Sequence, residues 1–251
     1  ALDEPKSSLS EAYNSLRGAI GFSTPNGAPE TLLVTSASAG EGKSTTSYAM
    51  ARGFAKLGGR VLLIDVDMRR PSTHRQFEVD NAIGLSTVLT NQVTLEQAVR
   101  KSPFDNLDFM TSGPIPPSPT ELLASNRLIA LIEEVRSKYD MIVFDAPPIL
   151  GLADAPLLSS LTDGTLLVIE SDRNRRGVLK GTLRRMKLAK GHVIGVALTK
   201  FDATHASSYT YYYGYGYDYY AYDGGDRNKK KRSLFGRYRQ SRGAQPSAVE
   251  A

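Results

Sequence analysis

A short glycine-containing loop between two apolar segments constrains the fold of this sequence more than any other feature. The loop, residues 37–44, reads ASAGEGKS and follows the apolar run TLLVTS at 31–36. Residues 45–57 then place apolar side chains at helical three- and four-residue spacing. Strand, loop and helix in this order are typical of a phosphate-binding loop, here with alanine in place of the first glycine. We therefore predict an α/β protein that holds phosphates at the carboxyl end of a strand.

Each polar position of the loop has its own expected role. Gly40 and Gly42 let backbone N–H groups turn towards phosphate oxygens, and the start of the helix adds partial positive charge. Lys43 is expected to reach the β- and γ-phosphates, and the Ser44 hydroxyl to bind Mg²⁺. The predicted ATP-binding residues are Ser38, Ala39, Gly40, Glu41, Gly42, Lys43, Ser44 and Thr45.

Carboxylates follow two further apolar runs. The run VLLID at 61–65 leads into Asp65 and Asp67, which alternation of side chains points in the same direction. Two like charges at the ligand-binding edge of a sheet require a cation or a proton-transfer role. The run MIVF at 141–144 precedes Asp145, and a carboxylate in that position is the usual second anchor of Mg²⁺ in phosphate-loop enzymes.

The remaining pattern alternates strands with helices. This predicts a P-loop NTPase-like parallel sheet with helices on both faces. Further strands are expected at 107–110, 165–169 and 193–198, and further helices at 9–20, 126–138 and 176–189. Ser10 is the expected N-cap of the first helix, and the apolar stripe of the helix at 126–138 is Leu128, Ile129, Leu131, Ile132 and Val135. The expected organisation is an N-terminal helical segment (1–30), a P-loop domain (31–201) and a tail (202–251).

Composition excludes several classes of function. Without cysteine the chain has no disulfides, thiolate metal sites or thiol nucleophiles. It contains no stretch of 18 uncharged apolar residues, so we predict no membrane-spanning helix within it. A net charge of +5 is compatible with nucleic-acid binding, but residues 1–201 carry only +2 of it. We therefore expect no nucleic-acid partner.

The tail holds most of the tyrosines and much of the charge. It shows no periodicity and almost no aliphatic residues, so we expect it to be disordered and flexible. Eight basic residues and no acidic residue lie between 227 and 242. Taken alone, the tyrosine tract fits a low-complexity aromatic linker as well as a substrate. Nine of the 13 tyrosines are Tyr209, Tyr211, Tyr212, Tyr213, Tyr215, Tyr217, Tyr219, Tyr220 and Tyr222.

The order of these motifs carries a family resemblance. GEGKST, then an apolar run with DVDMR, then an apolar run with DAPP resembles the bacterial tyrosine kinases, the autokinase domains of capsular and exopolysaccharide co-polymerases. Residues 113–123 (GPIPPSPTELL), and Glu11 with Arg17 in the first helix, resemble further segments of that family. The tyrosine-rich tail resembles the family's autophosphorylation site.

The resemblance implies an ATP- and Mg²⁺-dependent, non-specific protein-tyrosine kinase. Such an enzyme transfers the γ-phosphate to the nine tail tyrosines, between subunits, and regulates polysaccharide synthesis and export. It implies that Asp65 takes the proton from the tyrosine hydroxyl and that Arg69 lies near the transferred phosphoryl group. It also implies that Asp67 joins Ser44 and Asp145 at the metal. The implied catalytic set is Lys43, Asp65, Asp67 and Arg69.

The resemblance also implies partners. These are neighbouring subunits in a homo-oligomer such as a ring, contacted through Glu11 and Arg17, and a tyrosine phosphatase. A further partner is a membrane-spanning co-polymerase or activator segment, fused or separate, at the cytoplasmic face of the bacterial inner membrane. The start at Ala1 rather than Met favours the fused form, excised.

Two other functions stay open at this point. One is a positioning ATPase of the chromosome-partitioning and division-site type, which transfers no phosphate to protein. Ser38 counts against it, since those ATPases open the loop with an extra lysine. The other is a binding module with a structural nucleotide. Among the positions that depart from the kinase pattern, Asn14 replaces the middle arginine of the N-terminal motif, and Thr199 stands where relatives often place an adenine-binding asparagine.

Overall fold

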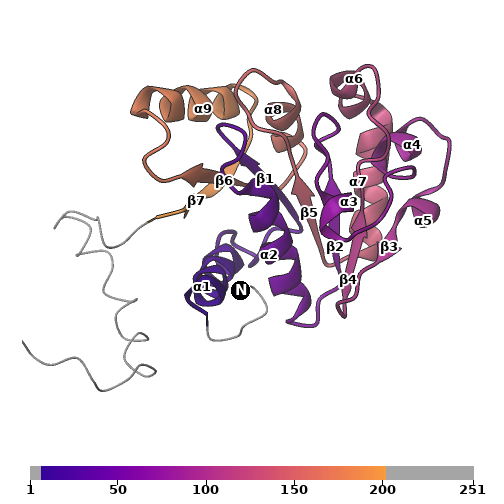
Figure 1. The fold of residues 1–251 in the computed structure, drawn as a ribbon, viewed down its shortest axis with the longest axis horizontal. Coiled ribbons are helices and arrows are strands. Elements are labelled where there is room, and N and C mark those ends of the chain that lie inside the picture. The colour runs from indigo at the N-terminus through magenta and orange to yellow at the C-terminus, as the bar shows by residue number, and fades with distance from the viewer. Residues whose placement is uncertain (1–6, 202–251) are drawn as a thin grey trace, which may run out of the picture. The chain divides into compact units, whose positions relative to one another are not determined.

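The computed structural model describes residues 7–201 as a seven-stranded sheet covered by helices (Figure 1). The strands are β1 (Thr31–Ser36), β2 (Val61–Asp65), β3 (Arg100–Lys101), β4 (Leu107–Met110), β5 (Met141–Asp145), β6 (Gly164–Glu170) and β7 (Val193–Thr199). The helices are α1 (Ser8–Gly21), α2 (Lys43–Ala55), α3 (Thr73–Gln76), α4 (Leu85–Leu89), α5 (Leu95–Ala98), α6 (Pro119–Leu123), α7 (Asn126–Lys138), α8 (Asp154–Ser159) and α9 (Arg176–Leu188). The predicted tail and its tyrosines lie outside the described residues.

The strand order places the predicted site residues at one edge. The sheet runs β3-β4-β2-β5-β1-β6-β7, and every neighbouring pair is parallel except β3 and β4. The phosphate-binding loop leaves β1, which pairs with β5 and β6. On the other side of β5, Asp65 of β2 lies opposite Asp145. The carboxylates and the loop therefore meet at the carboxyl end of three central strands.

Apolar side chains fill both faces of the sheet. One core cluster joins strand residues such as Leu33 and Phe144 to α7, α8 and α9. The other joins residues such as Leu32 and Leu63 to α2 and α1. Every residue of β1, β2 and β5 is buried, which explains why their sequences are continuous apolar runs rather than alternating ones. The prediction of helices on both faces is confirmed.

Several details differ from the sequence predictions. The short helices α3, α4, α5, α6 and α8 and the two-residue strand β3 were not predicted, because four to six residues are too few to show a period. Ile129 was assigned to the buried stripe of α7, but 45% of it is exposed because it lies on the outer side of the helix. Helix α2 ends at Ala55, so Leu57 lies beyond it and is 67% exposed.

The described part of the chain holds no helix with the length and hydropathy needed to cross a bilayer. The described helices are at most 14 residues long, and they pack their apolar sides against the sheet.

The N-terminal cap of α1 also differs from the prediction. Ser7, not Ser10, precedes the helix in an extended conformation, and its hydroxyl oxygen accepts a hydrogen bond from the Ser10 backbone N–H at 3.1 Å. Ser10 therefore lies inside the first turn.

We expect Ser7→Ala to lower the free energy of unfolding by about 1 kcal/mol, because it removes this cap. Ser10→Ala, three residues later, should change it by less than about half of that, since its side chain does not cap the helix. Urea unfolding of both variants measures the difference. Equal effects of the two substitutions would contradict the cap assignment.

Candidate active site

Two glycines shape the phosphate-binding loop between β1 and α2. Gly40 and Gly42 adopt φ angles of 83° and 93°, a left-handed conformation that residues with a Cβ rarely take. Gly42 is also the N-cap of α2, so Lys43 and Ser44 open the helix. The loop therefore turns directly into a helix N-terminus, where free backbone N–H groups favour an anion.

Polar contacts from residues late in the chain hold the phosphate-binding loop in place, and the sequence alone did not predict them. The fully buried carboxylate of Glu41 accepts a hydrogen bond from the Ser38 backbone N–H at 2.7 Å and another from the Asn174 side-chain amide. The Thr199 hydroxyl donates to the Glu41 carbonyl at 2.7 Å. Thr199 occupies the position considered for adenine binding, but here its hydroxyl fixes the loop. Asn174 and Thr199 are more than 130 residues away from Glu41 in the chain, so no local sequence pattern predicts these contacts.

The Lys43 ammonium brings together all three predicted metal ligands. Its Nζ lies 3.1 Å from Asp67 Oδ2, 3.7 Å from Asp145 Oδ1 and 3.3 Å from Ser44 Oγ. Burial by itself lowers the pKa of Lys43, but the carboxylates of Asp145 and Asp67 outweigh it and hold that pKa above its ordinary value. The two carboxylates therefore stabilise the charged form of Lys43 in this site.

Asp65 lies opposite Asp145 in the sheet and organises the loop that follows β2. It is fully buried, and its carboxylate accepts hydrogen bonds from the backbone N–H groups of Asp67 (3.0 Å), Ser72 (2.8 Å) and Thr73 (2.9 Å). Burial and repulsion from Asp145 raise the pKa of Asp65 to about 7, although the N–H donors act in the opposite direction.

Asp145 is positioned by two hydroxyls that sequence analysis did not single out. Ser47 of α2 donates to its Oδ1 at 3.1 Å, and Ser72 donates to its Oδ2 at 3.1 Å. Ser47 lies one helical turn after Lys43, so α2 contributes both the cation and this hydroxyl. The i, i+4 spacing on α2 is the signal from which Ser47 could have been found.

Arg69 has contacts that its predicted role did not include. Its guanidinium binds both carboxylate oxygens of Asp154, through Nε at 2.7 Å and one terminal nitrogen at 3.4 Å, and the Thr120 hydroxyl at 2.9 Å. Thr120 in turn donates to Asp154. Asp154 is 1% exposed, and such two-pronged charged contacts are strong and geometrically specific. Arg69 thereby ties the loop after β2 to α6 and α8.

The donor set fits a divalent cation bound together with phosphates. Three carboxylates, Asp65, Asp67 and Asp145, are buried beside one ammonium, so the cluster lacks positive charge when all three are ionised. Within residues 7–201 no group of three or more acidic or histidine side chains is placed to hold a metal ion. Mg²⁺ in proteins usually takes one or two carboxylates and completes its shell with water and substrate phosphates.

The two predicted oligomerisation residues lie on different sides of α1. Glu11 is exposed, whereas Arg17 is partly buried and donates from its guanidinium to the Gly53 carbonyl of α2 at 2.9 Å. Arg17 therefore has a structural contact inside the chain. The role of both residues between subunits stays a prediction.

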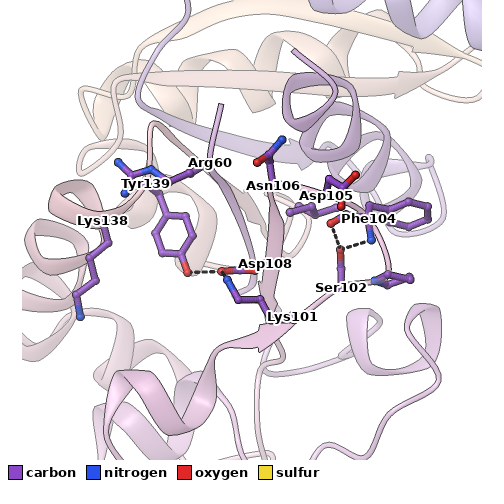
Figure 2. A pocket seen from close by; sticks show the side chains of 11 residues that line it. Arg60, Lys101, Ser102, Phe104, Asp105, Asn106, Asp108, Lys138 and Tyr139 are labelled. Carbon is purple, nitrogen blue, oxygen red and sulfur yellow. Dashed lines mark hydrogen bonds and ion pairs between the residues drawn. The ribbon is translucent and has the colours of Figure 1, made fainter. Parts of the chain in front are cut away.

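A cavity of about 590 Å³ lies away from these residues (Figure 2). Its lining includes Arg60, which precedes β2, and Tyr139, which precedes β5, so it lies at the amino ends of the strands. Figure 2 shows the Tyr139 hydroxyl pointing at Asp108, to which it donates at 2.8 Å. Ligands of parallel sheets bind beyond the carboxyl ends, so this cavity is separate from the predicted ATP site.

Comparison with known proteins identifies the family. A family model described as an AAA domain matches residues 30–187. Tyrosine-protein kinase YwqD of Bacillus subtilis is 41% identical over 83% of this chain and 88% of its own length. Putative tyrosine-protein kinase CapB of Staphylococcus aureus is 36% identical over 82% of this chain and 91% of its own. The chain belongs to the bacterial tyrosine-protein kinases.

Solved structures agree with this assignment to the bacterial tyrosine kinases. The crystal structure of the chimerical protein CapA2B2 superposes with a TM-score of 0.75 and 33% identity, covering 78% of this chain and 86% of that one. The predicted P-loop NTPase-like fold class is thereby confirmed. A Cyanothece McdA structure, with a TM-score of 0.58 and 22% identity, shares the fold alone.

Proposed function

We propose that this bacterial tyrosine kinase transfers the γ-phosphoryl group of ATP to tyrosines of its own residues 209–222, between neighbouring subunits. The observation that carries the proposal is the convergence of Ser44, Asp67 and Asp145 on the Lys43 ammonium, at the mouth of a phosphate-binding loop. Nine tyrosines follow within the same chain. A nucleotide site and a dense set of acceptors on one chain favour self-phosphorylation within an oligomer.

The loop residues supply binding and charge neutralisation. The backbone N–H groups of residues 38–45 would hold the phosphates, and the Lys43 ammonium would offset negative charge on the transferred group. Ser44, Asp67 and Asp145 would hold Mg²⁺, which supplies further neutralisation of phosphate charge when bound. The contacts of Ser47 and Ser72 keep the Asp145 carboxylate in a fixed orientation for this task.

The proton balance requires a base, and we propose Asp65 for this role. The tyrosine oxygen forms a bond to the γ-phosphorus, the bond from that phosphorus to the bridging oxygen breaks, and ADP leaves. The hydroxyl proton passes to the Asp65 carboxylate. A tyrosine hydroxyl has an ordinary pKa near 10, so a base is required at neutral pH. A pKa of about 7 suits that role. Because Asp65 is fully buried, the loop at 66–73 has to move for a tyrosine to reach it.

We extend the proposal to regulation of polysaccharide synthesis and export. It is supported by relatives of the same family, among them CapB and a putative tyrosine-protein kinase in the cps region of Klebsiella pneumoniae. The proposed partners are neighbouring subunits, a tyrosine phosphatase and a membrane-spanning co-polymerase. This chain covers 88% of YwqD but 28% of EpsB of Ralstonia solanacearum, so the family includes both short and much longer chains.

A mixing experiment tests transfer between subunits. One chain carries Lys43→Met and retains all its tyrosines; the other has an intact ATP site but phenylalanine at the nine tyrosines of 209–222. We expect neither chain alone to gain phosphate in this segment with Mg·ATP, and the mixture to gain it on the Lys43→Met chain. Mass spectrometry of the two chains, distinguished by isotope labelling, measures this. Tyr238→Phe, outside the cluster, is the matched control and should leave phosphorylation unchanged.

The alternative outcomes are distinct. If the mixture stays unphosphorylated while the wild type gains phosphate, transfer occurs within one chain. ATP hydrolysis without phosphotyrosine in the wild type would contradict the proposal and favour a positioning ATPase.

A further inference from the structure

Positive charge is concentrated in one part of the described chain. Residues 173–200 contain nine Lys and Arg and no Asp or Glu. The rest of residues 1–201 contains 14 basic and 21 acidic residues, a net charge of −7. The segment comprises α9, its two flanking loops and β7, which Figure 1 shows at one end of the sheet. An almost neutral body therefore carries a strongly basic region.

The outer face of α9 carries four cations that have no acidic partner among residues 7–201. Arg176, Lys180, Arg184 and Lys187 succeed one another at four- and three-residue spacing, and all four are exposed. None of them forms an ion pair within residues 7–201. Like charges at this spacing disfavour a helix. An anionic partner would relieve that repulsion.

Exposed aliphatic side chains border these cations. On α9, Leu183 is 43% exposed and Leu188 75% exposed. On β7, which ends the strand order, Val196 is 52% exposed and Leu198 55% exposed.

The strand register shows which face of the sheet Val196 and Leu198 occupy. They lie opposite Leu167 and Ile169 of β6, which belong to the core cluster that contains Met186 of α9. The two β7 residues are therefore on the same face of the sheet as α9.

We propose that α9 and the outer strand β7 form a docking surface for a membrane with anionic lipid headgroups. The cations match the negative surface potential of such a membrane, and the bordering leucines and valine can enter the headgroup region. The cavities of about 590 and 340 Å³ in the described residues are not lined by α9 or β7, and a lipid surface requires no cavity.

The phosphates of nucleic acid, or the carboxylates of an acidic peptide, would pair with the cations alone. They would make no apolar contact with the four aliphatic side chains that are exposed beside the cations. The combination of charge and apolar area therefore favours lipid. This inference does not depend on the proposed kinase activity.

Vesicle sedimentation of the full chain tests the surface. The vesicles contain either phosphatidylcholine alone or phosphatidylcholine with 30% phosphatidylglycerol, at about 0.1 M salt. We expect binding to the anionic vesicles only. The variant Lys180→Gln/Arg184→Gln should bind about 25-fold more weakly, about fivefold for each cation removed. Glutamine preserves helix propensity at both positions.

A matched control removes the same charge elsewhere. Lys56→Gln/Arg127→Gln replaces two exposed cations, one just beyond the end of α2 and one on α7, and should change binding less than about threefold. All variants retain the cations at 227–242, so their contribution is the same throughout. Leu188→Ser should weaken binding about fivefold at low and at high salt, because it removes apolar rather than ionic contact.

Three results would overturn the proposal. The first is equal binding of the α9 variant and the control variant. The second is equal binding to neutral and anionic vesicles. The third is unchanged binding of Leu188→Ser together with displacement from the vesicles by duplex DNA at equal phosphate concentration, which would assign the surface to nucleic acid.

Discussion

Replacing Lys43 with methionine is expected to lower the rate of autophosphorylation by about 10³-fold. The ammonium is the cation of the loop, 3.1 Å from Asp67 and 3.7 Å from Asp145, and methionine keeps most of the lysine side chain's length without its charge. Phosphotyrosine formation with Mg·ATP over time measures the effect. Lys56→Met, which replaces an exposed lysine just beyond the end of the same helix, is the matched control and should retain the wild-type rate.

The same substitution should also lower stability in the absence of nucleotide. It leaves two buried carboxylates without their cation, which costs about 3–5 kcal/mol. Rates are therefore compared at a temperature where circular dichroism shows both variants folded, and Lys43→Arg, which preserves the charge, serves as a second variant. A Lys43→Met enzyme that is folded and retains more than about a tenth of the wild-type rate would contradict the assigned role.

Gly84→Ala is expected to lower the free energy of unfolding by about 3 kcal/mol. The backbone of Gly84 is extended, so conformational strain is not the reason. A Cβ at this position would lie 2.3 Å from the Gly113 nitrogen and 2.3 Å from the Thr111 carbonyl oxygen. Both are backbone atoms, and moving them breaks the hydrogen bond from Leu85 N–H to the Thr111 carbonyl and the one from Gly113 N–H to the Asn81 side chain.

The matched control for this prediction is Gly18→Ala in α1. A Cβ there meets no neighbouring atom within 4 Å among the described residues, so alanine should raise the free energy of unfolding by about 0.5–1 kcal/mol. In urea unfolding, the free energy of unfolding should therefore fall for Gly84→Ala and rise for Gly18→Ala, each relative to the wild type. If Gly84→Ala were as stable as the wild type, the close contact of the Gly84 backbone with residues 111–113 would be contradicted.

Much of the candidate active site followed from the sequence because its parts are local. The loop at 37–44 and the carboxylates Asp65, Asp67 and Asp145 each stand directly after an apolar run. Parallel pairing brings the ends of such runs to one edge, so their convergence on Lys43 could be predicted without knowing any distance. The helix at 126–138 was likewise predictable, because 13 residues are enough to show a period.

The rest depended on contacts between residues far apart in the chain. Arg69 meets Asp154 across 85 positions, and Glu41 meets Asn174 across 133, so neither pairing leaves a local pattern.

The cations of α9 likewise separate what the sequence predicts from what only the tertiary structure shows. The sequence by itself determined the phosphate-binding loop, the strand-end carboxylates and the tyrosine cluster, since spacing within one segment sets each of them. It also determined that α9 is rich in cations. Only the tertiary structure decided which carboxylate each cation meets, and that those on the outer face of α9 meet none within residues 7–201. The physical reason is that charge pairing acts across space at a few ångströms, whereas a sequence records only order along the chain.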